Sequence, residues 1–130
     1  TLILMCWTVD PNSGRNWRDY YPGNRTIDVM AFDCYSTFTP DGTYRSPRDQ
    51  IGPAYRLTQR LGKSFAIAEL GTVLVQGDDG TGRARWLHRC ARWLRHHDAR
   101  FVSYWDTNNI ALTDRPSRRA WRHIVTRQWR

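Results

Sequence analysis

The sequence contains very little lysine and glutamate, and it has no long hydrophobic run. Lys63 and Glu69 are the only residues of their types among 130. A membrane-spanning helix needs about 18 or more consecutive apolar residues. No run approaches that length, so we expect neither a membrane span nor a membrane partner. The opening Leu2 to Met5 is too short for a signal peptide and has no basic flank. With 40% hydrophobic and 25% charged residues, the composition predicts a soluble globular domain.

Positive charge is carried almost entirely by arginine. Nineteen arginines and one lysine oppose 12 acidic residues, which gives a net charge of +8. Such an excess is compatible with a partner that bears phosphates. It is also what a GC-rich coding sequence produces, with hydrated arginines spread over the exteriors of helices. No run of adjacent basic residues exceeds two. We therefore favour the second interpretation and expect no nucleic-acid partner.

Cysteine is also scarce. Cys6, Cys34 and Cys90 form no C-x-x-C pair and no other metal-ligand spacing, so we predict no metal site. An odd number of cysteines cannot be a complete set of disulfides. We favour three small buried apolar residues, with a Cys6–Cys34 bond between neighbouring strands as the alternative.

Short apolar runs alternate with helical patterns along the chain. Four runs, each too short for a helix, predict strands at Leu2–Thr8, Ile27–Tyr35, Ser64–Leu70 and Phe101–Asp106. Apolar periodicity and terminal signals predict helices at Pro47–Leu61, at Thr81–His97 and after an N-cap at Asp114. The connection from Asp10 to Asn24 is loop-like, with one helical turn near Trp17. This alternation predicts an α/β fold with a parallel sheet, either doubly wound or a piece of a barrel.

The chemistry is expected at the carboxyl ends of the strands, where parallel α/β folds bind ligands. No G-x-G-x-x-G or G-K-[ST] sequence follows any of these strands, so a nucleotide site has no support. Strand alternation places Phe65, Ile67 and Glu69 on one face. It places Asp33 and Tyr35 together on one face of the preceding strand.

The polar and aromatic residues at these strand ends each allow two interpretations. Glu69 ends an apolar strand, where an unpaired buried carboxylate is costly. It is therefore either a working carboxylate at a solvent-filled cleft or the partner of an arginine from a neighbouring loop. Asp33 either belongs to the site or caps loop amides. Trp7 and Trp105 are either core aromatics or platforms that stack on sugar rings.

Two segments resemble a known family. Tyr20-Tyr21-Pro22-Gly23-Asn24, followed by Ile27 to Tyr35, is similar to the YYPGD…VDVIGFDxY stretch of glycoside hydrolase family 26, the β-mannanase group. Lys63 to Gly71 is similar to the family's GKPIMIAEFG strand. The resemblance extends from Trp7 to about Trp121 in the family's order, with Asn24 where the family often has aspartate. It implies a TIM-barrel-like α/β fold. Residues 1–130 would form a single partial domain, the C-terminal half of a (β/α)8 barrel with four βα units corresponding to strands five to eight.

The resemblance also implies an activity and a role for each strand end. The activity is retaining, endo-acting hydrolysis of β-mannan or a related β-linked polysaccharide, with Glu69 as the catalytic nucleophile. Tyr35 would orient Glu69, and Asp33 would contact substrate hydroxyls. The residues expected to bind substrate are Trp7, Asp33, Tyr35, Trp105 and Asp106. No cofactor is expected, because glycosyl transfer to water uses carboxylates alone.

One part of that mechanism is missing. A retaining hydrolase needs a second carboxylate about 5 to 5.5 Å from the nucleophile, which the family supplies from the end of strand four. This sequence starts after that strand, so we expect the acid/base in an N-terminal half and little or no hydrolysis by the 130-residue piece. Asp33 and Asp106 are the nearest alternatives. A solvated aspartate, however, is largely ionised at about pH 7.

Three organisations therefore stay open: a fragment of a longer protein, one half of an oligomeric barrel, or a degenerate remnant. The strand edges at Leu2–Thr8 and Phe101–Asp106 favour self-association. The functional alternative is a non-catalytic or degenerate carbohydrate-binding relative. In both cases the partner is a polysaccharide or oligosaccharide, and by analogy with such hydrolases we expect secretion.

Overall fold

A four-stranded parallel sheet forms the centre of the molecule. The computed structural model describes residues 1–36 and 42–128. The strands are β1 (Leu2–Met5), β2 (Val29–Ser36), β3 (Ser64–Thr72) and β4 (Val102–Tyr104). They lie side by side in chain order, and every neighbouring pair is parallel. The expected α/β class with a parallel sheet is thus confirmed.

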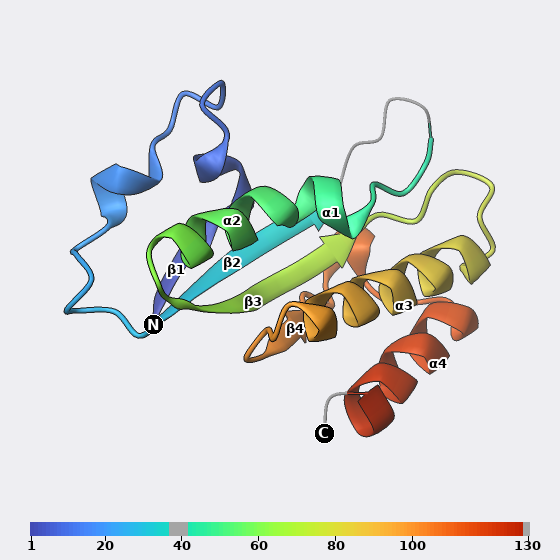
Figure 1. The fold of residues 1–130 in the computed structure, drawn as a ribbon. Coiled ribbons are helices and arrows are strands. Elements are labelled where there is room, and N and C mark those ends of the chain that lie inside the picture. Colours follow the sequence, from blue (N-terminus) through green and yellow to red (C-terminus); the bar gives the residue numbers. More distant parts are fainter. Residues whose placement is uncertain (37–41, 129–130) are drawn as a thin grey trace.

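The helices lie on one side of this sheet (Figure 1). They are α1 (Pro47–Gln50), α2 (Gly52–Arg60), α3 (Thr81–His96) and α4 (Arg115–His123), the last of which continues into a π-helical turn at Ile124–Gln128. Helices α2 and α3 pack on the sheet, and α4 packs on α3. Short 3-10 turns are present at Cys6–Val9, Trp17–Tyr20 and Asn108–Ile110. The helices expected after β3 and β4, and the helical turn expected near Trp17, are confirmed.

Aspartate side chains explain where α3 and α4 begin. Asp114 accepts a hydrogen bond from the backbone N–H of Ser117 at 2.7 Å, and Pro116 occupies the first turn. Before α3, the Asp78 carboxylate accepts hydrogen bonds from the backbone N–H groups of residues 80, 82 and 83. These groups have no partner within a helix, so the carboxylates stabilise the helix starts.

The single helix expected at Pro47–Leu61 is instead two helices. Helix α1 ends at Gln50 and α2 begins at Gly52, with Ile51 as the turn between them. Pro53 is the physical reason. It has no backbone N–H to donate, and its ring crowds the carbonyl group four residues earlier.

Two strands are shorter than the apolar pattern predicts. Strand β1 ends at Met5 rather than Thr8, because the Thr8 hydroxyl donates to the Met5 carbonyl at 2.7 Å and closes a 3-10 turn. Strand β4 is confined to Val102–Tyr104. The N–H of Trp105 still donates to the Leu70 carbonyl at 3.0 Å, and the chain then leaves the sheet.

The hydrophobic core lies between the sheet and the helices. Strands β2 and β3 contribute the alternating side chains Met30, Phe32, Phe65 and Ile67, and α3 contributes Trp86, Leu87, Cys90 and Leu94. The outer side of α3 carries the exposed Arg85, Arg89 and Arg92, as its periodicity predicts.

One arginine is inside the protein. Arg83 of α3 is only 1% exposed. Its guanidinium forms an ion pair with Asp114, donates to the Ser117 hydroxyl, and donates to the carbonyl groups of Thr72, Ile110 and Ala111. A buried charge is tolerated when it is paired and its other donors are used, and both conditions are met here.

A disulfide joins the ends of β1 and β2. Cys6 and Cys34 are bonded, whereas Cys90 is a free, buried thiol. Strand pairing explains the bond, because Met5 lies opposite Asp33 and the next residue of each strand is the cysteine. The interpretation of three buried thiols is therefore wrong for Cys6 and Cys34, and the pairing alternative is confirmed.

Candidate functional site

A bulge in β3 determines the direction of Glu69. In the pairing of β2 with β3, Phe32 lies opposite Ile67, but the next residue, Asp33, lies opposite Glu69. Ala68 is thus an extra residue in β3. Directly paired residues on adjacent strands share a face of the sheet, so Glu69 and Asp33 lie on the same face.

This face is the one that the helices leave uncovered. Phe65 and Ile67 belong to the core beneath the helices, whereas Glu69 does not. The expectation that these three residues share a face is wrong, because strict alternation holds only for a strand without a bulge. The bulge instead brings Glu69 next to Asp33 and Tyr35 of β2, which alternation correctly places together.

Tyr35 and Glu69 are in direct contact. The Tyr35 hydroxyl donates a hydrogen bond to Oε2 of Glu69. A hydrogen bond to an ionised acceptor is among the stronger kinds in proteins. The expected contact between these two residues is therefore present, and it fixes one carboxylate oxygen of Glu69.

Gly71 makes room for the tyrosine ring. It lies opposite Tyr35 in the strand pairing. A Cβ atom at residue 71 would lie 2.9 Å from Cδ1 of Tyr35 and 2.7 Å from Cδ1 of Ile110. Both distances are shorter than ordinary carbon–carbon contacts. The absence of a side chain at residue 71 thus leaves room for the Tyr35 ring, whose hydroxyl reaches Glu69.

Asp33 has the perturbed carboxyl group of the site. Burial, and secondarily the negative charge of Glu69, raise the pKa of Asp33 from 3.8 to about 6. Its Oδ1 atom is buried and has no hydrogen-bond partner among the described residues. No backbone amide of the described loops donates to the carboxyl, so the capping role is not seen in this part of the chain. A carboxyl group with a raised pKa beside a second carboxylate is a common feature of catalytic sites.

A cleft of about 420 Å³ opens beside these residues. It brings together three of the residues expected to bind substrate, Trp7, Asp33 and Tyr35. Trp7 is 45% exposed, and an exposed indole can stack on the apolar face of a ligand. Glu69 is connected to the cleft through Tyr35, which lines it.

Four polar residues that line the cleft are not among those predicted from the sequence, and one of them is Asp10, which follows the 3-10 turn at Cys6–Val9. Arg45, Asp49 and Gln50 line it from the segment that follows β2. Gln50 donates from Nε2 to the Cys34 carbonyl at 3.1 Å, and its Oε1 is buried without a partner among the described residues. The signal available in the sequence is the Ser46-Pro47 helix start, which places the next residues at the carboxyl edge of β2.

Trp105 and Asp106 lie elsewhere. Neither is among the residues that line the cleft. Trp105 is 46% exposed at the end of β4. The Asp106 carboxylate accepts a hydrogen bond from the backbone N–H of Leu112 at 2.6 Å, so it holds the loop that follows β4. The structure therefore does not bring these two residues together with Trp7, Asp33 and Tyr35.

The described residues contain no group of three or more His, Cys, Asp or Glu side chains placed to hold a metal ion. Within the same part of the chain, no helix is long and apolar enough to cross a membrane.

Comparison with known proteins does not identify a family for this chain. No protein-family model matches this chain, and no curated protein matches it significantly.

Proposed function

We propose that this chain is part of a retaining glycoside hydrolase that acts on β-mannan or a related β-linked polysaccharide, with Glu69 as the nucleophile. The observation that carries the proposal is the contact of the Tyr35 hydroxyl with the Glu69 carboxylate, beside Asp33, at the carboxyl edge of a parallel sheet. This constellation combines a held carboxylate, a second carboxyl group with a raised pKa, and an adjoining cleft.

We also assign the four βα units to one half of a (β/α)8 barrel. Doubly wound sheets carry helices on both faces, whereas here the helices lie on one side (Figure 1). The uncovered face carries Asp33, Tyr35 and Glu69, which in a closed barrel would point inward at its carboxyl end.

The chemistry follows from the carboxylate geometry. Tyr35 holds Oε2 of Glu69, so Oε1 is the oxygen that attacks the anomeric carbon. The bond from that carbon to the leaving oxygen breaks, the leaving oxygen takes a proton from an acid, and water later releases the sugar from Glu69. Trp7 supplies an aromatic face for a sugar ring at the rim of the cleft.

The described residues offer no well-placed general acid for this mechanism. Asp33 is a better proton donor than a solvated aspartate, because its pKa of about 6 keeps it protonated below that pH. It lies next to the nucleophile on the same face, however, and the resemblance to family 26 assigns the acid/base to a different strand. We therefore propose that the acid/base residue comes from outside these 130 residues. The chain alone should then hydrolyse polysaccharide poorly.

A non-catalytic carbohydrate-binding protein is the second candidate. It is favoured by the single glutamate of the sequence and by a cleft that combines an exposed tryptophan with the polar side chains of Arg45, Asp49 and Gln50. In both cases the partner is a polysaccharide or oligosaccharide. The Cys6–Cys34 bond supports secretion, since disulfides persist mainly outside the cytosol.

An activated sugar tests the nucleophile without needing an acid. A 2-deoxy-2-fluoro-β-mannobiosyl fluoride carries a leaving group that departs unprotonated, so attack by Glu69 would release fluoride and leave the sugar bonded to the carboxylate. Intact and peptide mass spectrometry should find the label on Glu69. The Glu69→Gln variant should lose labelling by about a thousandfold or more. Tyr35→Phe should slow it by about tenfold or more.

Asp28→Asn is the matched control, because Asp28 is an exposed aspartate at the opposite end of β2. It should label at the rate of the unmodified chain. Label on another residue, or labelling that survives Glu69→Gln, would contradict the assignment. Absence of label together with saturable binding of mannan oligosaccharides would favour the binding protein over the hydrolase.

A further inference from the structure

The positive charge of this protein is concentrated in one part of the molecule. Residues 81–130 contain 12 arginines and three aspartates, whereas residues 1–80 contain eight basic and nine acidic residues. Nine of those arginines are exposed on α3, on α4 or on the turn that follows α4. The arginines are thus hydrated on helix exteriors, as the sequence predicts, but they are not evenly spread.

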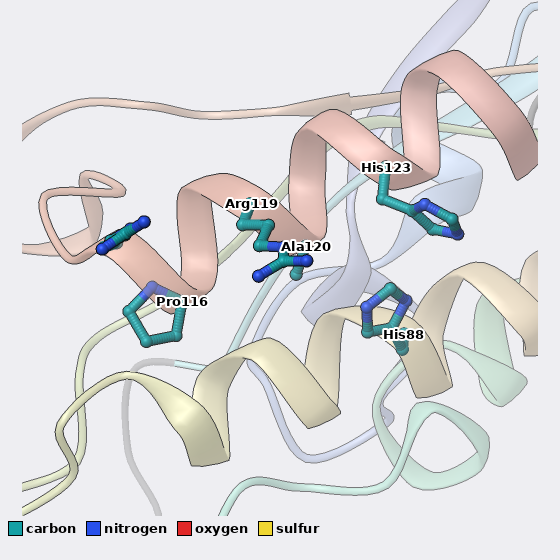
Figure 2. A pocket seen from close by; sticks show the side chains of 6 residues that line it. His88, Pro116, Arg119, Ala120 and His123 are labelled. Carbon is teal, nitrogen blue, oxygen red and sulfur yellow. The ribbon is translucent and has the colours of Figure 1, made fainter.

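Two adjoining hollows lie among the arginines of α4, on the surface that we call the α3–α4 face. One, of about 520 Å³, lies between α3 and α4 and is lined by His88 together with Arg115, Arg119 and His123 (Figure 2). The imidazole rings of His88 and His123 are 5.8 Å apart between centroids. The second, of about 650 Å³, shares Arg115, Arg119 and His123 and extends along α4 past Arg122. Among the described residues, no carboxylate lines either hollow.

Within residues 1–36 and 42–128, these arginines form no ion pair with an acidic side chain. Among the residues that the structure describes, the only ion pair joins the buried Arg83 to Asp114. Neither α3 nor α4 contains an aspartate or glutamate. Like charges gathered on one face repel one another and oppose folding. A bound anion would relieve that repulsion, because guanidinium groups pair with carboxylates and with phosphate or sulfate oxygens in a fixed fork.

The side chains around these arginines limit the kinds of anionic partner that the surface can bind. Single-stranded nucleic acids are bound through aromatic side chains that stack on bases. A membrane surface is bound through large apolar side chains beside the basic ones. The only large hydrophobic side chain exposed on the described part of α3, α4 and the turn after α4 is Val125. A rigid nucleic-acid duplex would contact the ridges of the helices but not enter both hollows.

A single anionic sugar chain fits this surface better. Arg115, Arg119 and Arg122 lie about one turn apart along α4, a rise of about 5.4 Å per turn. That repeat is close to the length of one sugar unit. A linear chain with one charged group on each sugar can therefore place successive anions against successive arginines while its rings occupy the two hollows.

We propose that the α3–α4 face binds a linear acidic polysaccharide, of the polyuronate type, at a site separate from the carboxylate cleft. Arg119 and Arg122 are its central contacts, and Arg115 and His123 flank them. The site needs no catalysis by Glu69. Binding at this site holds the protein on a charged polysaccharide matrix, independently of any reaction at the cleft.

Isothermal titration calorimetry with oligogalacturonate tests this surface on the full 130-residue chain. Binding should weaken about tenfold when Arg119→Gln and Arg122→Gln are combined. The combined Arg56→Gln and Arg60→Gln variant is the matched control, because it removes two exposed arginines from α2. It should change binding by less than about twofold. Circular dichroism would verify that both variants are folded.

Three results would overturn the proposal. One is binding of oligogalacturonate no tighter than that of a neutral mannan oligosaccharide. Another is equal weakening by the two arginine pairs, which would reveal only an effect of net charge. The last is tighter binding, at the same salt concentration, to a DNA duplex or to vesicles that contain phosphatidylglycerol. Since only binding is measured, the result is independent of the proposed hydrolysis.

Discussion

Tyr35, Gly71 and Glu69 form a small unit in which the position of each residue depends on another. The tyrosine hydroxyl holds one carboxylate oxygen of Glu69, and the tyrosine ring occupies the space that a side chain at residue 71 would need. The carboxylate is therefore positioned by two neighbouring strands rather than by a mobile loop. A nucleophile gains most from such preorganisation, because its direction is fixed before substrate binds.

Asp33 should make the stability of the protein fall as pH rises from about 4 to about 7. Its pKa is raised to about 6, so the folded chain keeps a proton that the unfolded chain has already released. The stabilising contribution is present below about pH 4 and is lost above about pH 6. Asp33→Asn should remove this dependence and stabilise the protein at about pH 7 by about 1 kcal/mol, a figure reduced for the partial exposure of the carboxyl.

Urea unfolding at several pH values measures this effect. The matched control is Asp28→Asn, which removes the same charge from an exposed site at the other end of β2. It should leave the pH dependence unchanged. A loss of stability in Asp33→Asn at neutral pH would mean that the ionised carboxylate has favourable contacts in the folded chain, contrary to this account.

The arrangement of the elements was more predictable than their ends. Buried apolar runs and helical periodicity gave four parallel strands and the helices between them, since both signals extend over many residues. The bulge at Ala68 has no such signal, because no glycine or proline marks it. The early end of β1 depends on one hydroxyl, that of Thr8. Both features affect the geometry of the candidate site more than they affect the fold.

The sequence predicted the residues of the cleft only in part. Asp33 and Tyr35 lie near the carboxyl end of β2, and Trp7 follows β1, so their positions along the strands predicted them. Arg45 and Gln50 reach the cleft because α1 folds back over the end of β2, where Gln50 bonds the Cys34 carbonyl. That approach is a tertiary contact between segments 16 residues apart, and local patterns do not encode it.

The bond between β1 and β2 should make the protein sensitive to reductants. Cys6 and Cys34 are 28 residues apart in sequence. Reduction of a disulfide that closes a loop of that length should lower the free energy of unfolding by about 3 kcal/mol. Trp7 and Asp33, each adjacent to one of the cysteines, should become less well ordered at the cleft.

Dithiothreitol treatment followed by urea unfolding measures this loss. The combined Cys6→Ala and Cys34→Ala variant is the control, since it should begin with lower stability and show no further response to reductant. An equal response of both proteins would assign the effect to the buried Cys90 or to the reagent rather than to the disulfide.

At the scale of the whole molecule, the uncovered sheet face and the edge at β1 are where we expect contact with another copy. Strand β1 is an edge strand, and Ile3 on it is 55% exposed on the face that also carries Asp33. Unpaired backbone groups beside an apolar side chain favour association. We expect the purified chain to self-associate as its concentration rises, and Ile3→Lys to shift it toward the monomer.

Sedimentation velocity over a range of concentrations tests the expected association. Leu74→Lys is the matched control, because Leu74 is an exposed apolar residue on the loop between β3 and α3. It should not alter the sedimentation of the chain. A chain that stays monomeric at every concentration, or an equal response to both lysines, would exclude the sheet edge as the contact.

The buried Arg83 also has a consequence for the order in which the chain folds. Its charge is neutralised by Asp114, and its other donors are satisfied by groups between Thr72 and Ser117. If α3 docked on the sheet alone, it would carry an unpaired guanidinium into the interior, at a cost of several kcal/mol. We therefore expect α3 to dock only together with the chain that begins α4. The last third of the protein then assembles in one cooperative step, and a nascent chain would stay open there until Asp114 has been synthesised.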